Sequence, residues 1–186
     1  MSRTHEDIED ELLVLLCQEG DGEALEALIA RWQPRLVRLA WRLTADREAV
    51  RDVAQDAWLA IVRGLKRLDD PARFRVWAYR IVKNKSADWT RRRIAQRNTG
   101  RNLRNATVEA AEDAQNGTDS SDQVELLRKG LACIPEEQRA ILSLHYLDGM
   151  SVAEIGRALE VPLGTVKSRL YHARNRLRQT LERTES

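Results

Sequence analysis

The side chains best suited to chemistry near the end of the chain are cations and hydrogen-bonding groups that share one side of a helical pattern. Apolar residues recur at positions 166, 170, 173, 177 and 181, so a helix here would bury that stripe. The opposite side presents Thr165, Lys167, Ser168, Tyr171, His172 and Arg174. Their donors and acceptors can reach phosphates and base edges in a major groove. The pattern predicts contact with duplex DNA, and a solvated basic surface is the alternative.

A second group combines cations with aromatic rings. Residues 73–93 hold eight bases and one acid, which is far from the net charge of +2 for the whole chain. The candidate binding residues are Arg73, Trp77, Arg80, Lys83 and Asn84. Cations hold phosphates, aromatic rings stack on unpaired bases, and an amide can pair with a base edge. This group predicts single-strand binding, and a solvated face over core aromatics is the alternative.

A third group is acidic and polar. Residues 50–65 carry apolar side chains at the spacing of one helix face. Asp52, Gln55 and Asp56 lie away from that stripe, toward solvent or a partner.

The elements that position these groups are all predicted to be helices. Apolar spacing indicates a helix over 25–43, which Pro34 should kink or interrupt. A loop over 66–73 separates the helix at 50–65 from one over 74–93. Ser151 and Glu154 have the spacing of a capping box that starts a short helix. After a turn at 160–162 the next helix begins, so the C-terminal part is predicted to be a helix-turn-helix.

Composition supports the same fold class. With only nine Gly and four Pro, the chain has too little turn chemistry for a sandwich or barrel. We predict an all-α protein of two small helical domains, 1–93 and 123–186, joined by a flexible linker over 94–122. Residues 105–122 contain five acids and no base. Two distant cysteines favour neither a disulfide nor a zinc site, and no cofactor is predicted.

The N-terminal residues 1–30 carry nine acids and one base, unlike a signal peptide. No apolar run approaches the ~18 residues of a membrane span. We therefore expect a cytoplasmic protein without membrane insertion.

Several of these segments resemble one family. Residues 151–156 read SVAEIG and residues 161–170 read VPLGTVKSRL, which is similar to the promoter-reading helix-turn-helix of sigma domain 4. Residues 52–56 (DVAQD) and 74–81 (FRVWAYRI) resemble sigma domain 2. The resemblance covers about residues 20–93 and 124–182. It is to the extracytoplasmic-function (ECF) group of bacterial sigma factors, in the sigma-70 family.

The resemblance implies a sigma factor that brings RNA polymerase to promoter DNA, and no enzyme. Asp52, Gln55 and Asp56 match the helix that docks on the clamp helices of the polymerase's largest subunit, and domain 4 would meet the flap. The helix over 74–93 matches the part that holds the non-template strand of the minus-ten element, with Asn84 at a base-contacting position. The C-terminal group from Lys167 to Arg174 matches readers of the minus-thirty-five element. An anti-sigma factor is an implied partner.

Two residues depart from the family pattern. Glu160 stands where many helix-turn-helix units have glycine, which predicts a strain of about 1 kcal/mol if its φ angle is positive. Ala78 replaces a bulkier apolar residue.

Parts of this sequence are also compatible with two other functions. A dimeric repressor would explain 135–182 but not the basic, aromatic helix of the first half. A nucleic-acid enzyme is disfavoured because the acids lack metal-ligand spacing and the histidines are scattered.

Overall fold

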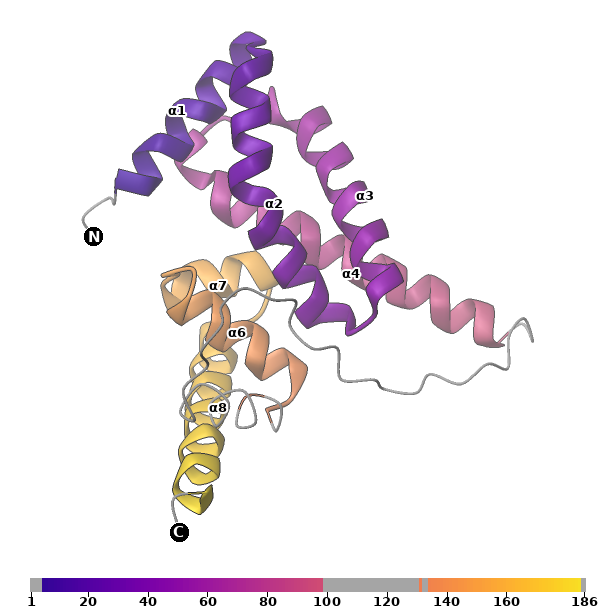
Figure 1. Cartoon of the computed structure of the whole chain (residues 1–186), viewed down its shortest axis with the longest axis vertical. Coiled ribbons are helices and arrows are strands. Elements are labelled where there is room, and N and C mark those ends of the chain that lie inside the picture. Colours follow the sequence, from indigo (N-terminus) through magenta and orange to yellow (C-terminus); the bar gives the residue numbers. More distant parts are fainter. Residues whose placement is uncertain (1–4, 99–130, 132–133, 185–186) are drawn as a thin grey trace.

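The computed structural model describes residues 5–98, 131 and 134–184, and every element in these ranges is helical. In chain order the elements are α1 (His5–Glu19), α2 (Gly22–Thr44), α3 (Arg47–Leu65), the 3-10 turn η1 (Pro71–Arg73), α4 (Phe74–Asn98), α6 (Glu136–Tyr146), α7 (Val152–Leu159) and α8 (Leu163–Thr184). Figure 1 shows α1 to α4 as one group and α6 to α8 as another. The predicted all-α class is confirmed. Helix α4 continues past residue 93, and the rest of the predicted linker, 99–122, lies outside the described residues.

Trp32 forms the centre of the core in the first group. Its fully buried ring on α2 meets Phe74 and Tyr79 of α4 edge-on, with ring centroids 5.1 and 5.6 Å apart. Such aromatic pairs contribute about 0.5–1.5 kcal/mol beyond the burial of area. They fix the rotation of α4 about its own axis. Tyr79 therefore lies inside the domain, although it stands among basic residues in the sequence. Ala78 beside it is also fully buried.

Helix α2 passes through Pro34 without interruption, so that part of the expectation is wrong. The proline ring is exposed, whereas Trp32 and Leu36 on either side are completely buried. Burial of these large apolar side chains contributes about 1.5–3 kcal/mol each, which offsets the roughly 3 kcal/mol cost of an interior proline.

Helix α1 was not predicted, because its many acids suggested only an acidic segment. Asp10, Val14 and Cys17 form its buried side. The guanidinium Nε of Arg31 on α2 lies 2.6 Å from Asp10 Oδ1. Burial raises the pKa of Asp10, although the nearby Trp32 side chain and the charges of Arg31 and Arg35 act in the opposite direction. This buried ion pair ties α1 to α2.

The two helical groups are in direct contact. Helix α7 packs on α4, and α6 packs on α2 (Figure 1). The buried apolar residues form one cluster that runs from Val14 through Tyr79 to Ile141 and Leu170. The described parts of the two predicted domains therefore share a packed interface.

Candidate nucleic-acid and polymerase interfaces

The turn between α7 and α8 is built from local hydrogen bonds. Ser151 and Glu154 form the predicted capping box: the Glu154 amide donates to Ser151 Oγ at 3.2 Å, and the Ser151 amide donates to Glu154 Oε2 at 2.8 Å. Glu160 ends α7 with φ 56° and ψ 44°, so the condition on which the strain was expected, a positive φ angle, is met. The strain of about 1 kcal/mol that follows is therefore present.

Gly156 allows the turn to close tightly. A Cβ atom at this position would lie 3.1 Å from the carbonyl oxygen of Val161 and 3.3 Å from Leu163 Cδ2. The Val161 amide donates to the Gly156 carbonyl at 3.0 Å. The absence of a side chain thus lets the start of α8 approach α7, which sets the direction of α8.

Helix α8 buries Val166, Leu170 and Ala173, as the apolar spacing indicated. Of the predicted DNA-facing residues, Thr165 is half-buried, and those with exposed side chains are Lys167, Ser168, Tyr171, His172 and Arg174. Arg169, between them in sequence, is instead paired with Glu137 of α6 at 2.6 Å. The structure therefore brings the predicted polar set together on the outer side of α8.

Tyr146 at the end of α6 was missed by the sequence reasoning. It is 56% exposed, and its ring lies under the guanidinium of Arg174, with 5.5 Å between the guanidinium carbon and the ring centroid. A cation over a ring in this way is held by about 0.5–1 kcal/mol when exposed. Tyr146 therefore restrains Arg174 on the outer face of α8. In the sequence, the only sign of this role is an aromatic residue near the end of a helix.

The predicted strand-binding residues, Arg73 at the end of η1 and the others on α4, have diverse surroundings. Asn84 is exposed, and the exposed Arg73 pairs with Asp70 at 3.0 Å. Trp77 is half-buried and packs tightly against Gly64 of α3. Arg80 and Lys83 both pair with Glu160 of the other helical group.

The predicted polymerase-facing residues lie along α3. Asp52 and Gln55 are exposed and Asp56 is half-buried. Two apolar neighbours on the same helix, Leu59 and Val62, are 46% and 44% exposed. Positions 52, 55, 56, 59 and 62 follow the spacing of one helix face, so the acids continue into an apolar strip. Sequence reasoning missed this strip because such residues usually face the core.

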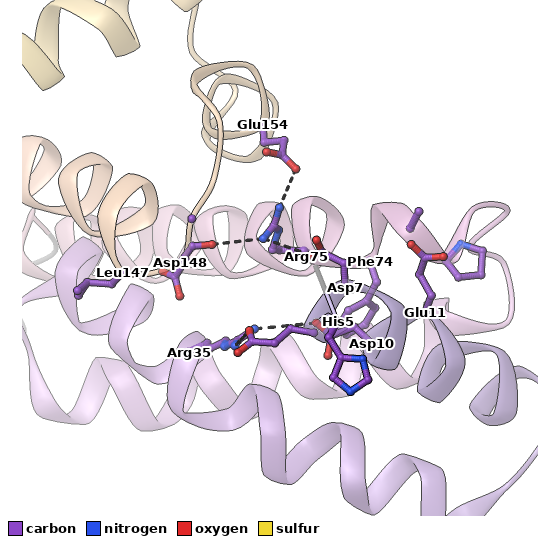
Figure 2. Close-up of a pocket in the computed structure, with 14 residues that line it drawn as sticks. His5, Asp7, Asp10, Glu11, Arg35, Phe74, Arg75, Leu147, Asp148 and Glu154 are labelled. Carbon is purple, nitrogen blue, oxygen red and sulfur yellow. Dashed lines mark hydrogen bonds and ion pairs between the residues drawn. The ribbon is translucent and has the colours of Figure 1, made fainter. Parts of the chain in front are cut away.

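An open cleft of about 660 Å³ lies where the two helical groups meet (Figure 2). Arg75 of α4 extends into it and donates to Glu154 Oε1 at 2.9 Å and to the Asp148 carbonyl at 3.3 Å. Asp7 of α1 lies 3.5 Å from the same guanidinium. Burial raises the pKa of Glu154, but hydrogen bonds from Ser151 and Arg75 outweigh it, and the net shift is downward. The Glu154 carboxylate is therefore charged and joins the two groups.

The part of the chain described by the structure brings no three His, Cys, Asp or Glu side chains together in a way that could hold a metal ion. Among the same residues, no helix combines the length and the apolarity that a bilayer crossing requires.

Comparison with known proteins explains the arrangement. The family model for Sigma-70 region 2 matches residues 28–96, and that for Sigma-70, region 4 matches residues 125–177. The ECF RNA polymerase sigma-E factor of Escherichia coli K12 is 29% identical, over 91% of this chain and 92% of that protein. The chain belongs to the ECF group of the sigma-70 family. RNA polymerase sigma-H factor of Pseudomonas aeruginosa is also 29% identical, over 94% of both chains.

Solved structures of other proteins share the fold of this sigma factor. CnrH in complex with the cytosolic domain of CnrY is 26% identical, with a TM-score of 0.61 over 94% of this chain and 97% of that one. The sigma factor RpoE in complex with the anti-sigma factor NepR from Bartonella quintana shares the fold, at 24% identity and a TM-score of 0.65 over 85% and 96% of the two chains. As an ECF RNA polymerase sigma factor, the protein is a transcription initiation factor that directs core polymerase to promoters, and it is not an enzyme.

Proposed function

We propose that this sigma factor reads a promoter through two separate faces. The outer face of α8 contacts the minus-thirty-five element as duplex, and α4 holds the separated non-template strand of the minus-ten element. The observation that carries the proposal is the helix-turn-helix formed by the capped helix α7, a tightly closed turn and α8. One side of α8 exposes Lys167, Ser168, Tyr171, His172 and Arg174.

The exposed side chains of α8 are of the types that a groove-reading helix uses. Lys167 and Arg174 supply positive charge for phosphates or guanine edges, and Ser168 and Tyr171 supply hydroxyl groups. Arg174 is held by Tyr146, which lowers the entropy that it would lose on binding.

Duplex binding measured against salt concentration tests this face. In polymerase that carries the full sigma factor, Lys167→Ala or Arg174→Ala should cost about 1–3 kcal/mol at a base contact, or lower the salt slope by about one at a phosphate contact. Arg38→Ala removes an exposed charge from α2, outside both proposed interfaces, and is the matched control. Equal effects of all three changes would refute specific contact by α8.

The proposed strand-binding face is assembled from Arg73 at the end of η1 and from Trp77, Arg80, Lys83 and Asn84 of α4. Its cations lie on exposed or half-exposed positions, and the amide of Asn84 is exposed. Trp77 is half-buried against α3, so only the exposed part of its ring would be open to a base, while its packing keeps α4 in place.

The strip on α3 is the proposed site for core polymerase. Asp52, Gln55 and Asp56 would meet cationic groups of the clamp helices, and Leu59 would add apolar contact. The α6 to α8 group would meet the flap of the polymerase.

Affinity for core polymerase tests this strip. Asp52→Arg with Asp56→Arg should weaken assembly at least tenfold without loss of helix content, because both changes reverse charge at a complementary surface. Leu59→Ala should weaken it less. Glu26→Arg, at an exposed position of α2, is the control. Unchanged assembly of the double variant would remove α3 from the interface.

An anti-sigma factor is the proposed partner of the free protein. Support comes from the RpoE–NepR complex, in which a similar fold is bound to an anti-sigma factor. We place the action of this sigma factor in the cytoplasm, with 1–93 and 123–186 as its working domains. Of the segment 94–122 between them, residues 94–98 continue α4, and the rest is the proposed linker.

A further inference from the structure

Glu160 occupies a backbone conformation that is unfavourable for a residue with a side chain. Its φ of 56° lies in the left-handed region, which glycine adopts freely and which commonly ends helices. The hydrogen bonds of its carboxylate leave the turn and go to α4 in the other helical group. The reason for a glutamate here therefore lies in the contact between the two groups.

The carboxylate of Glu160 is held by two cations of α4. Arg80 donates from Nε to Oε1 at 2.8 Å, and its Nη2 lies 2.6 Å from the same oxygen; Lys83 Nζ lies 2.5 Å from Oε2. Hydrogen bonds from Lys83 and Arg80 lower the pKa of Glu160, so the group is ionised at neutral pH. The Glu160 carboxylate presents two anionic oxygens to Arg80 and Lys83. A DNA phosphate would present a similar pair of oxygens to the same cations.

Independent contacts join the groups at the other end of α7. Arg75 binds Glu154 and the Asp148 carbonyl, near the start of α7. Between Glu154 and Glu160, α7 packs along α4, and buried apolar side chains of both groups form one cluster. Helix α7 thus covers part of α4 and is anchored by ion pairs near both of its ends.

This closed arrangement is too compact for a promoter. The two promoter elements are named for positions about 25 base pairs apart, which is about 85 Å of duplex at 3.4 Å per pair. Helix α8 follows α7 after a short turn, and α7 touches α4. The start of α8 therefore lies within about one or two helix diameters of α4, roughly 10–25 Å. The two reading helices cannot engage both elements until the groups separate.

We propose that Glu160 is an internal lock, which holds the free sigma factor closed and competes with the DNA backbone for Arg80 and Lys83. The inference rests on the proposed strand-binding role of these two cations. Core polymerase must separate the groups to place them on two promoter elements, and this separation frees both cations. The unfavourable backbone of Glu160 is retained because glycine at this position would remove the lock.

Compactness of the full-length free protein tests the lock directly. Glu160→Gln keeps the size of the side chain and removes its charge. The ratio of open to closed molecules should rise about three- to tenfold, because two partly exposed ion pairs are lost. Small-angle scattering should report a larger radius of gyration than for the wild type. Glu26→Gln, which removes an exposed carboxylate of α2, is the matched control and should leave the radius unchanged.

Two further variants separate opening from unfolding. Glu160→Gly should open the protein as Glu160→Gln does, yet raise the melting temperature of the helix-turn-helix because the backbone strain is relieved. Glu160→Lys should open it further, and adding Lys83→Glu should restore the compact form. Unchanged radii for Glu160→Gln and Glu160→Lys would overturn the proposal, as would failure of the charge exchange to restore compactness.

Strand binding distinguishes failure of the lock from failure of the proposed function. Fluorescence anisotropy with a labelled single-stranded minus-ten oligonucleotide should show three- to tenfold tighter binding by free Glu160→Gln than by free wild type. In assembled polymerase the two should bind equally, since the groups are already apart. Opening without tighter strand binding would count against Arg80 and Lys83 as strand contacts. An unchanged radius with normal loss of strand binding in Lys83→Ala would count against the lock alone.

Discussion

Replacing Ser151 with alanine should destabilise the helix-turn-helix by an amount that depends on pH. The change removes two hydrogen bonds: Ser151 Oγ accepts from the Glu154 amide at 3.2 Å and donates to Glu154 Oε2 at 2.7 Å. The bond from the Ser151 amide to the same carboxylate remains. An N-cap change to alanine costs about 0.5–2 kcal/mol, so we expect a loss of about 1–2 kcal/mol near neutral pH.

The pH dependence follows from the pKa of Glu154, which lies below its ordinary value of 4.5 in the folded protein. A carboxylate with a lowered pKa stabilises the fold fully above the unfolded value, and this contribution disappears as pH falls through the folded value. In acid the hydroxyl of Ser151 no longer donates to a charged group. The difference between wild type and Ser151→Ala should therefore shrink as the pH falls below 4.5 and through the lowered pKa of Glu154.

Urea unfolding followed by circular dichroism measures both effects. The free energy of unfolding should be compared for wild type and Ser151→Ala near pH 7 and near pH 3. Ser168→Ala, at an exposed position of α8, is the control and should change stability by less than about 0.5 kcal/mol. A Ser151→Ala difference that is absent, or equal at the two pH values, would refute the reasoning about the capping box.

Two more changes test how the reading helices are held. Asp46→Ala should lower the free energy of unfolding by about 1–2 kcal/mol, because Asp46 caps α3 and pairs with Arg93 of α4. Burial raises the pKa of Asp46, but hydrogen bonds from Ala49 and Arg93 outweigh it, and the net shift is downward. The loss of stability in Asp46→Ala should therefore fade in strong acid, where Asp46 is protonated. A loss that acid leaves unchanged would contradict this reasoning. Gly156→Ala should lower the melting temperature of the protein. The added methyl group would overpack the turn at a cost of about 1–3 kcal/mol, which exceeds the gain of about 1 kcal/mol in helix propensity. A higher melting temperature would contradict the tight turn.

Features that depend on neighbours in sequence could be predicted. The capping box is a pattern of residues three apart, and the buried stripe of α8 repeats every three or four residues, so both were visible in the sequence. The sequence also marked Glu160 as a residue that would be strained if its φ angle were positive, because a turn of this kind commonly has glycine there, and the angle is left-handed.

Features that depend on packing between distant segments could not be predicted. Tyr79 lies among basic residues in sequence, yet it points to Trp32, far away on α2. Helix α1 is held by Asp10, whose partner Arg31 belongs to the next helix. Arg80 and Lys83 gave no sign of their pairing with Glu160, because no periodicity links residues about 80 positions apart.

The central claim is that α8 and α4 contact DNA in different states, and permanganate footprinting of promoter complexes tests it most directly. Polymerase carrying the Asn84→Ala sigma factor should occupy the upstream duplex nearly as well as wild type but show fewer reactive, melted thymines at the minus-ten element. Polymerase carrying Lys167→Ala should occupy fewer promoters, with normal melting at those that it binds. If Asn84→Ala weakened upstream binding as much as Lys167→Ala and left melting normal, the division of labour between the two helices would be contradicted.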